Sequence, residues 1–206
     1  MNETILLSTA YLPPSLYFKK ILHAEKIIID RSEHFVKQTF RNRCSIYGAN
    51  GQLDLIIPLE RSTERTPIGL KKISYHFDWQ TLHWRSLQSA YRSSPFFEYF
   101  EEDFKVFYEK KFDYLFDFNL EMLVFLCRIL KIKFQFELTD QYLKQYVGVE
   151  DLRQSISPKS MEFNTQAFPL EPYYQVFSGK YGYIPNLSVI DLLFHVGLKT
   201  VDILEQ

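Results

Sequence analysis

Cysteine and glycine are both scarce in this chain. Its 206 residues include two cysteines, Cys44 and Cys127, and seven glycines. Two thiols without metal-ligand spacing are typical of the reduced cysteines of a cytosolic protein, and they predict no metal site. The sequence also lacks a glycine-rich phosphate loop, a GxSxG nucleophile elbow and an HExxH zinc helix. The short motifs of the large enzyme families are therefore excluded, and the cofactor stays unknown.

A large net charge is also missing. The chain has 24 basic and 25 acidic residues, which gives a formal net charge of −1. We therefore expect no nucleic-acid partner, and only a local site for a small anionic or sugar-phosphate ligand. The most apolar long stretch, residues 115–132, carries Asp117, Glu121 and Arg128, which argues against a membrane span. The N-terminus does not resemble a signal peptide, so we expect a cytoplasmic location.

Large apolar side chains are abundant instead. Hydrophobic residues make up 46% of the chain, and 19 phenylalanines and 14 tyrosines are present. A chain of this length buries about 70% of the surface that it exposes when unfolded. We predict a single α/β domain over residues 1–206, with most of the aromatic side chains in its core.

The first thirty residues predict a parallel βαβ unit. Residues 5–7 and 26–29 are short apolar runs typical of buried strands, and Pro13 and Pro14 precede a predicted helix over residues 15–24. We then expect one long strand over residues 34–47, an Asn50-Gly51 hairpin turn and a return strand. The return strand covers residues 53–59. We expect further strands at 71–75, 134–138 and 174–177, helices at 79–93, 97–110, 112–130 and 186–196, and loops at 61–69 and 157–172.

Together these elements predict an α/β fold with a mixed sheet, a parallel βαβ opening, helices packed around the sheet and a helical middle section. In the helix at 79–93 the inward positions would be Trp79, Leu82, Leu87 and Tyr91. The last helix has its own start and stop signals. Ser188 would cap it, Asp191 would complete a capping box, and Gly197 would end it.

The best candidate for a binding site is the basic segment at residues 34–43. In an extended strand Lys37, Thr39, Arg41 and Arg43 would share one face. Cations placed this closely repel one another unless they are solvated or share an anion, and an arginine fork suits a phosphate or a carboxylate. A solvated strand face, balanced by acidic residues from elsewhere, is the alternative.

Three weaker candidates carry tyrosine, histidine or aspartate. Tyr11 and Tyr17 follow the first strand, where open parallel sheets bind ligands, although aromatic packing explains them too. His83, one helical turn after Trp79, is a candidate acid or base, with a structural histidine as the alternative. Asp191 and His195 could form a catalytic pair, but the helix dipole favours each residue at its own end of the helix.

Several segments of the chain resemble the WbqC-like family of bacterial proteins. The resemblance runs from Ile5 to Gly197 and is carried by Tyr11-Leu12-Pro13, Tyr17-Phe18, Lys37, Asn42, Arg43, Trp79, His83, Tyr91, Pro95, Tyr173, Gln175 and the stretch 185–194. Members are associated with polysaccharide and O-antigen gene clusters, and some are described as transferring glycine or another amino acid. The chain departs from the family at Ser8-Thr9, at Leu16 and at His195, where Gln-Pro, Gly and Asn are usual.

The resemblance implies one hypothesis about function, and the departures from the family pattern favour a second. The first is a group transferase that acts on a sugar or an activated amino acid. In it, Lys37 and Arg43 bind the anion, Asn42 and Asn186 orient the acceptor, and His83 is the catalytic residue. The second is a non-catalytic binding or assembly factor, which uses exposed aromatic side chains at Phe96, Phe97, Tyr99 and Phe100. Both hypotheses leave the substrate, and the choice between a monomer and a homo-oligomer, open.

Overall fold

The βαβ opening is present in the computed structural model, which describes residues 3–62, 65–160, 166 and 169–206. Strand β1 (Glu3–Ser8) leads into helix α1 (Ser15–His23) and then into strand β2 (Ala24–Asp30). The two strands pair in parallel, with Ile5 opposite Ile27 and Leu7 opposite Ile29. All four of these apolar side chains are buried. Burial of such runs is what drives a short parallel pair to form.

The parallel and antiparallel strands form two separate sheets. The parallel sheet has the order β5-β2-β1-β6, where β5 is Phe136–Leu138 and β6 is Glu150–Asp151. The antiparallel sheet is the hairpin of β3 (Arg43–Gly48) and β4 (Gly51–Ile56), and Gly51 takes the positive φ of 99° that its turn requires. The predicted α/β class, the parallel opening and the hairpin turn are thereby confirmed.

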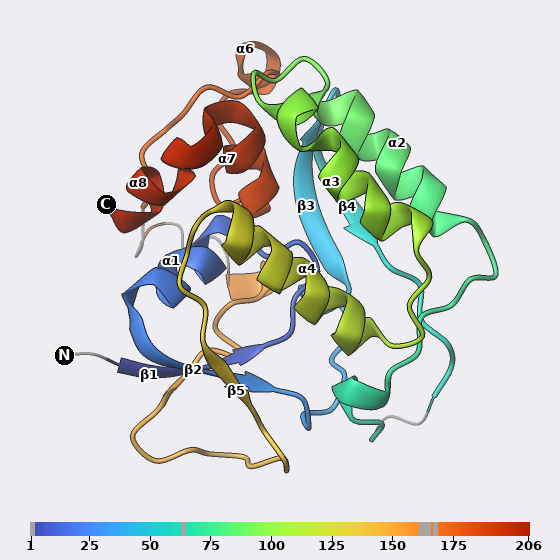
Figure 1. Ribbon diagram of the computed structural model, residues 1–206, viewed down its shortest axis with the longest axis vertical. Helices are drawn as coiled ribbons and strands as arrows, with labels where there is room; N and C mark the ends of the chain where they lie inside the picture. The colour runs from blue at the N-terminus through green and yellow to red at the C-terminus, as the bar shows by residue number, and fades with distance from the viewer. Residues whose placement is uncertain (1–2, 63–64, 161–165, 167–168) are drawn as a thin grey trace.

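In Figure 1 the helices lie above the parallel sheet and beside the hairpin. The parallel sheet lies at the bottom of that view, helix α4 crosses the centre, α2 and α3 lie beside the hairpin, and α7 and α8 lie near α1. Their bounds are α2 Trp79–Tyr91, α3 Phe97–Glu109, α4 Leu115–Ile129, α6 Ser178–Tyr181, α7 Val189–Val196 and α8 Thr200–Glu205, with short 3-10 turns at Ile68–Leu70, Pro158–Ser160 and Gly197–Lys199. No helix in the described part of the chain is long and apolar enough to cross a bilayer.

The long strand predicted over residues 34–47 is wrong for its first two thirds. Residues 35–36 have no regular structure, residues 37–42 form turns and bends, and Gln38 has a positive φ of 58°, which no regular strand contains. The reason lies in the buried side chains. Arg41 is drawn inward to a carboxylate, Thr39 donates a hydrogen bond to the carbonyl of Val36, and the chain therefore folds back on itself before β3 begins.

Smaller predictions also differ from the structure. Residues 71–75 form isolated bridges in place of a strand, and residues 174–177 have no partner strand among the described residues. The predicted inward position Leu82 is 57% exposed. The loop predicted at 157–172 falls partly outside the described residues, since 161–165 and 167–168 are not among them.

Helix α7 begins at Val189, later than predicted, and the Ser188 side chain makes no capping hydrogen bond. Gly197 does end α7, with a positive φ of 62°.

Candidate functional site

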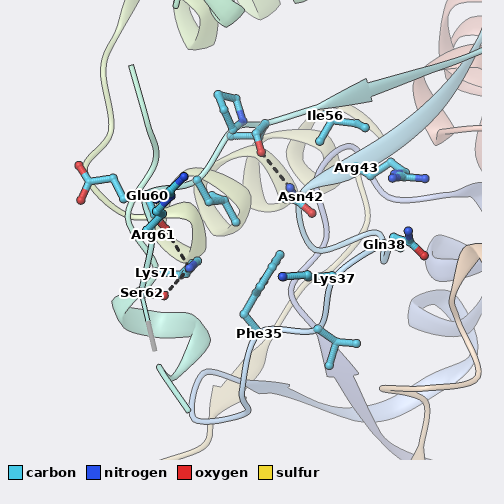
Figure 2. A pocket seen from close by; sticks show the side chains of 14 residues that line it. Phe35, Lys37, Gln38, Asn42, Arg43, Ile56, Glu60, Arg61, Ser62 and Lys71 are labelled. Atoms are coloured by element: carbon cyan, nitrogen blue, oxygen red, sulfur yellow. Dashed lines mark hydrogen bonds between the residues drawn. The ribbon is translucent and has the colours of Figure 1, made fainter. Parts of the chain in front are cut away.

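The candidate site is a cleft of about 890 Å³ at the open end of the hairpin (Figure 2). Two chain segments form its walls, one before β3 and one after β4, and Lys71 joins them from a third segment. The lining residues are Phe35, Val36, Lys37, Gln38, Asn42, Arg43, Ile56, Ile57, Pro58, Leu59, Glu60, Arg61, Ser62 and Lys71. Three of the predicted binding residues, Lys37, Asn42 and Arg43, therefore line one cleft.

Backbone pairing fixes the two walls in place. Arg43, the first residue of β3, is opposite Ile56, the last residue of β4. The Ile57 amide donates to the carbonyl of Asn42 at 2.9 Å, and Asn42 Nδ2 donates in return to the Ile57 carbonyl at 2.8 Å. Asn42 thus closes the base of the hairpin with its side chain. In Figure 2 its amide oxygen lies on the other side, away from that hydrogen bond.

Cations dominate the charge of the cleft. Lys37, Arg43, Arg61 and Lys71 line it, against the single carboxylate of Glu60. In the part of the chain that the structure describes, Lys37 and Arg61 make no hydrogen bond and no ion pair. Arg43 has one long contact, 3.4 Å from Nη1 to Asp54, while its Nε is buried without a hydrogen-bond partner. A buried donor without a partner is costly, so this arrangement favours an anion in the cleft.

Lys71 is the cation that the prediction missed. The residue is buried, and its Nζ donates to the Glu60 carbonyl at 3.0 Å and to the hydroxyl of Ser62. Burial lowers the pKa of Lys71, and the positive charge of Lys37 lowers it further. A bridge between Leu59 and Ile73 brings Lys71 beside Glu60. No local spacing in the sequence signals that long-range pairing.

His83, the predicted catalytic residue, lies in the interior and is not among the residues that line the cleft. Its Nδ1 is 3.0 Å from the hydroxyl of Tyr11, and that hydroxyl is 2.9 Å from the hydroxyl of Tyr108. Burial lowers the pKa of His83 to about 4, and a hydrogen bond to the backbone of Ile56 opposes this shift only in part. His83 is therefore neutral at physiological pH and lies next to the strand end that forms one wall of the cleft.

Tyr11 and Tyr17, predicted to contact a ligand, are buried as well. The Tyr17 hydroxyl donates to the carbonyl of Ser8 at 2.8 Å, at the end of β1. The aromatic ring of Tyr11 stacks on His83, with 5.7 Å between the ring centroids. Both tyrosines pack the turn between β1 and α1, which was the alternative for these residues.

Arg41 does not share a face with Lys37 and Arg43. It is 2% exposed and forms a two-pronged ion pair with Glu33, with Nε 2.8 Å from Oε1 and Nη2 2.5 Å from Oε2. The same Nη2 donates to the Ser8 hydroxyl at 2.7 Å. Close by, Arg153 pairs with the buried Asp30 at 2.7 Å. This network fills the carboxyl end of the parallel sheet and leaves a space of only about 10 Å³ there.

Asp191 lies in a second buried cluster, and the capping role predicted for its side chain is wrong. Its carboxylate accepts hydrogen bonds from Tyr91 at 2.9 Å, Tyr173 at 2.6 Å and Gln175 at 2.9 Å. The neighbouring His195 accepts from the Val176 amide at 3.0 Å through Nε2, and its Nδ1 is 2.6 Å from the carbonyl of Asp191. Both side chains thus hold the segment around Gln175 against α7.

Asn186 is buried at the entry to α7, where its φ is 52°. Neither Asn186 nor Asp191 is among the residues that line the cleft. Within the described ranges, no group of three or more histidine, cysteine or acidic side chains is placed to hold a metal ion.

The aromatic segment after α2 forms a separate, apolar hollow of about 760 Å³. Phe96, Tyr99 and Phe100 line it together with residues 195–199, and Tyr99 is 78% exposed. Phe97, which was predicted to be exposed with them, is fully buried in the core. Of the four predicted members, Tyr99 is exposed, Phe96 and Phe100 are partly buried at the rim of the hollow, and Phe97 lies in the core.

The comparisons with known proteins agree with the sequence resemblance. The model of the WbqC-like protein family matches residues 9–156, so this chain belongs to that family. The matched region contains the whole cleft and ends before α7. The uncharacterized protein Rv1507c of Mycobacterium tuberculosis (strain ATCC 25618 / H37Rv) is 23% identical over 228 residues, which cover 99% of this chain and 98% of the relative. No solved structure matches the chain.

Proposed function

We propose that this protein binds a small anionic ligand in the cleft, as a cytoplasmic group transferase of cell-surface polysaccharide biosynthesis. The ligand would be a phosphate or a carboxylate attached to a sugar or an amino acid. One observation carries the proposal: the cationic side chains of Lys37, Arg43 and Arg61 line one cleft beside the buried Lys71, with Glu60 as the single carboxylate among the lining residues. Like charges this close repel one another, and an anion between them turns that repulsion into attraction.

The roles of the individual side chains follow from their free hydrogen-bonding groups. Arg43 offers its guanidinium to the anion, since a single long contact to Asp54 is its one ion pair among the described residues. Lys37 supplies a second charge from the same segment, six residues before Arg43. The amide oxygen of Asn42 accepts a hydroxyl or an amine of the acceptor, since Nδ2 of the same amide is held by Ile57.

Proton transfer in the cleft falls to Glu60 and Lys71, which line it. The assignment of His83 as the catalytic residue stays a prediction, and its place in the interior supports another role. By packing against Tyr11 and the end of β4, His83 would hold the wall that carries Ile56. Asn186, Asp191, Tyr11, Tyr17 and Arg41 would act only at a distance, through the fold.

Thermal unfolding against a panel of nucleotide-sugars, sugar phosphates, nucleotides and amino acids tests the proposal. A ligand at about 100 times its dissociation constant stabilises the folded state by roughly 2.7 kcal/mol, which corresponds to about 5–10 °C for a chain of this size. We expect such a shift for an anionic ligand, and we expect Arg43→Ala to remove it. Arg92→Ala, at an exposed arginine after α2, is the matched control and should keep the shift. A shift that survives Arg43→Ala would refute the proposed site.

A binding or assembly factor is the second candidate function, and the apolar hollow at Phe96, Tyr99 and Phe100 favours it. An exposed tyrosine beside an apolar hollow is typical of a surface that contacts another protein. Size-exclusion chromatography with light scattering, on the wild type and on Tyr99→Ser, tests for a homo-oligomer through this surface. A wild-type monomer at all concentrations, with no partner in pull-downs, would argue against this candidate.

A further inference from the structure

Lys71 is the lysine that this fold buries. The residue is 8% exposed, and no other lysine in the described ranges is buried to that degree. It nevertheless lines the cleft, so its amine nitrogen borders both the interior and the space that a ligand would occupy. A lysine in such a place needs a reason, because burying an ammonium without a carboxylate partner is unfavourable.

The hydrogen bonds of Lys71 suit a neutral amine. Nζ donates to the Glu60 carbonyl and to the Ser62 hydroxyl, which are both uncharged acceptors. Within the part of the chain that the structure describes, Lys71 forms no ion pair. An ammonium has three N–H bonds, whereas a neutral amine has two. The two acceptors therefore satisfy a neutral amine in full and leave its lone pair directed away from both oxygens.

On balance the surroundings of Lys71 also favour the neutral amine. Figure 2 shows the nitrogen of Lys37 turned toward Phe35 and Lys71. Nζ of Lys71 lies 5.5 Å from the centre of the Phe35 ring, a contact that by itself favours the ammonium form. Burial and the charge of Lys37 lower the pKa of Lys71, and the carboxylate of Glu60 opposes them only in part. Desolvation and a neighbouring cation are the two means by which proteins make a lysine amine nucleophilic.

We propose that Lys71 condenses with the carbonyl group of an aldehyde that carries a phosphate or a carboxylate. The proposal rests on the anion-binding function above, since Arg43 and Lys37 would hold the anionic group while Lys71 attacks. The amine lone pair forms a C–N bond, the carbonyl π electrons pass to oxygen, and that oxygen takes up one amine proton. The carbinolamine then loses its hydroxyl and the remaining N–H hydrogen as water, which leaves an imine between Lys71 and the ligand.

Reductive trapping tests the proposal on the whole protein. The probe is erythrose 4-phosphate with sodium cyanoborohydride, and the labelled lysines are identified by peptide mass spectrometry. We expect labelling of Lys71 to be faster than that of the exposed neighbour Lys72, because a lowered pKa leaves a larger fraction of the amine neutral and nucleophilic. Excess inorganic phosphate should slow the labelling, and unphosphorylated erythrose should label Lys71 more slowly. Lys71→Arg should lose the adduct, whereas Lys72→Arg should keep it.

Equal labelling of Lys71 and Lys72, or preferential labelling of Lys37, would overturn the inference. The mapping is done on the wild type, so the result does not depend on the folding of any variant. Calorimetry with inorganic phosphate alone separates the two proposals. Phosphate binding without an adduct at Lys71 refutes the imine and leaves the anion site standing, whereas no phosphate binding refutes the anion site itself.

Discussion

The pH dependence of stability should report on His83 directly. The pKa of His83 is lowered from 6.5 to about 4 by burial. A group with a lowered pKa in the folded state binds protons more readily when the chain is unfolded, so protonation favours unfolding. The stabilisation by neutral His83 is therefore complete above pH 6.5, decreases as the pH falls, and is lost below about pH 4.

The size of the effect follows from the two pKa values. The full difference corresponds to about 3 kcal/mol, of which about 2 kcal/mol is lost between pH 7 and pH 5. His83→Gln removes the titration and keeps a polar side chain of similar size. The gap in unfolding free energy between the wild type and this variant should therefore shrink by about 2 kcal/mol over that pH range.

Urea unfolding followed by circular dichroism, at pH 7 and pH 5, measures the gap. His76→Gln is the matched control, because His76 is exposed, and its gap to the wild type should stay nearly constant. A gap for His83→Gln that is equal at both pH values would show that His83 is accessible to protons in the folded protein. It would then be a real candidate for acid–base catalysis, and our account of its environment would be refuted.

Two further predictions concern the structure around the cleft and the hollow. Arg41→Met leaves Glu33 buried without its cation and should lower the unfolding free energy by about 3–5 kcal/mol in urea titrations. The control Lys105→Met removes a solvent-exposed ion pair and should change the unfolding free energy little. Similar losses in both variants would contradict the contribution of the buried pair. Gly197→Ala forces a Cβ to 2.9 Å from the Phe96 ring at a φ of 62°, and the loss should be at least about 1–2 kcal/mol. Gly179→Ala meets no atom within 4 Å and should be neutral in the same assay, so equal effects of the two glycine variants would refute this reasoning.

The sequence predicted the parts of the fold that depend on local patterns. The βαβ opening and helix α2 follow from apolar spacing and start signals within a few residues of each other. The sequence also grouped Lys37, Asn42 and Arg43, which do line one cleft. The strand predicted to carry them, however, begins only at Arg43. These residues meet in the cleft because the chain turns between Lys37 and Asn42. Within this turn Arg41 points into the interior and forms its ion pair with Glu33.

Long-range contacts account for what could not be predicted. Lys71 reaches the cleft through a bridge between Leu59 and Ile73, and no periodicity indicates which segments pair. The capping box expected at Asp191 was a sound local pattern, but Tyr91 and Gln175 compete for the same carboxylate from far along the chain. Buried polar groups select their partners by proximity in the folded state, which a single sequence does not reveal.

The ion pair between Arg41 and Glu33 has a consequence for where substrates are sought. Open parallel sheets bind their ligands at the carboxyl ends of the strands. In this protein the side chain of Arg41 fills that edge, and its guanidinium donates a hydrogen bond to the Ser8 hydroxyl. The space that remains, about 10 Å³, holds at most about one water molecule. The buried network therefore fills the place where open parallel sheets usually bind ligands, and the cleft proposed for the anion lies elsewhere, at the open end of the hairpin.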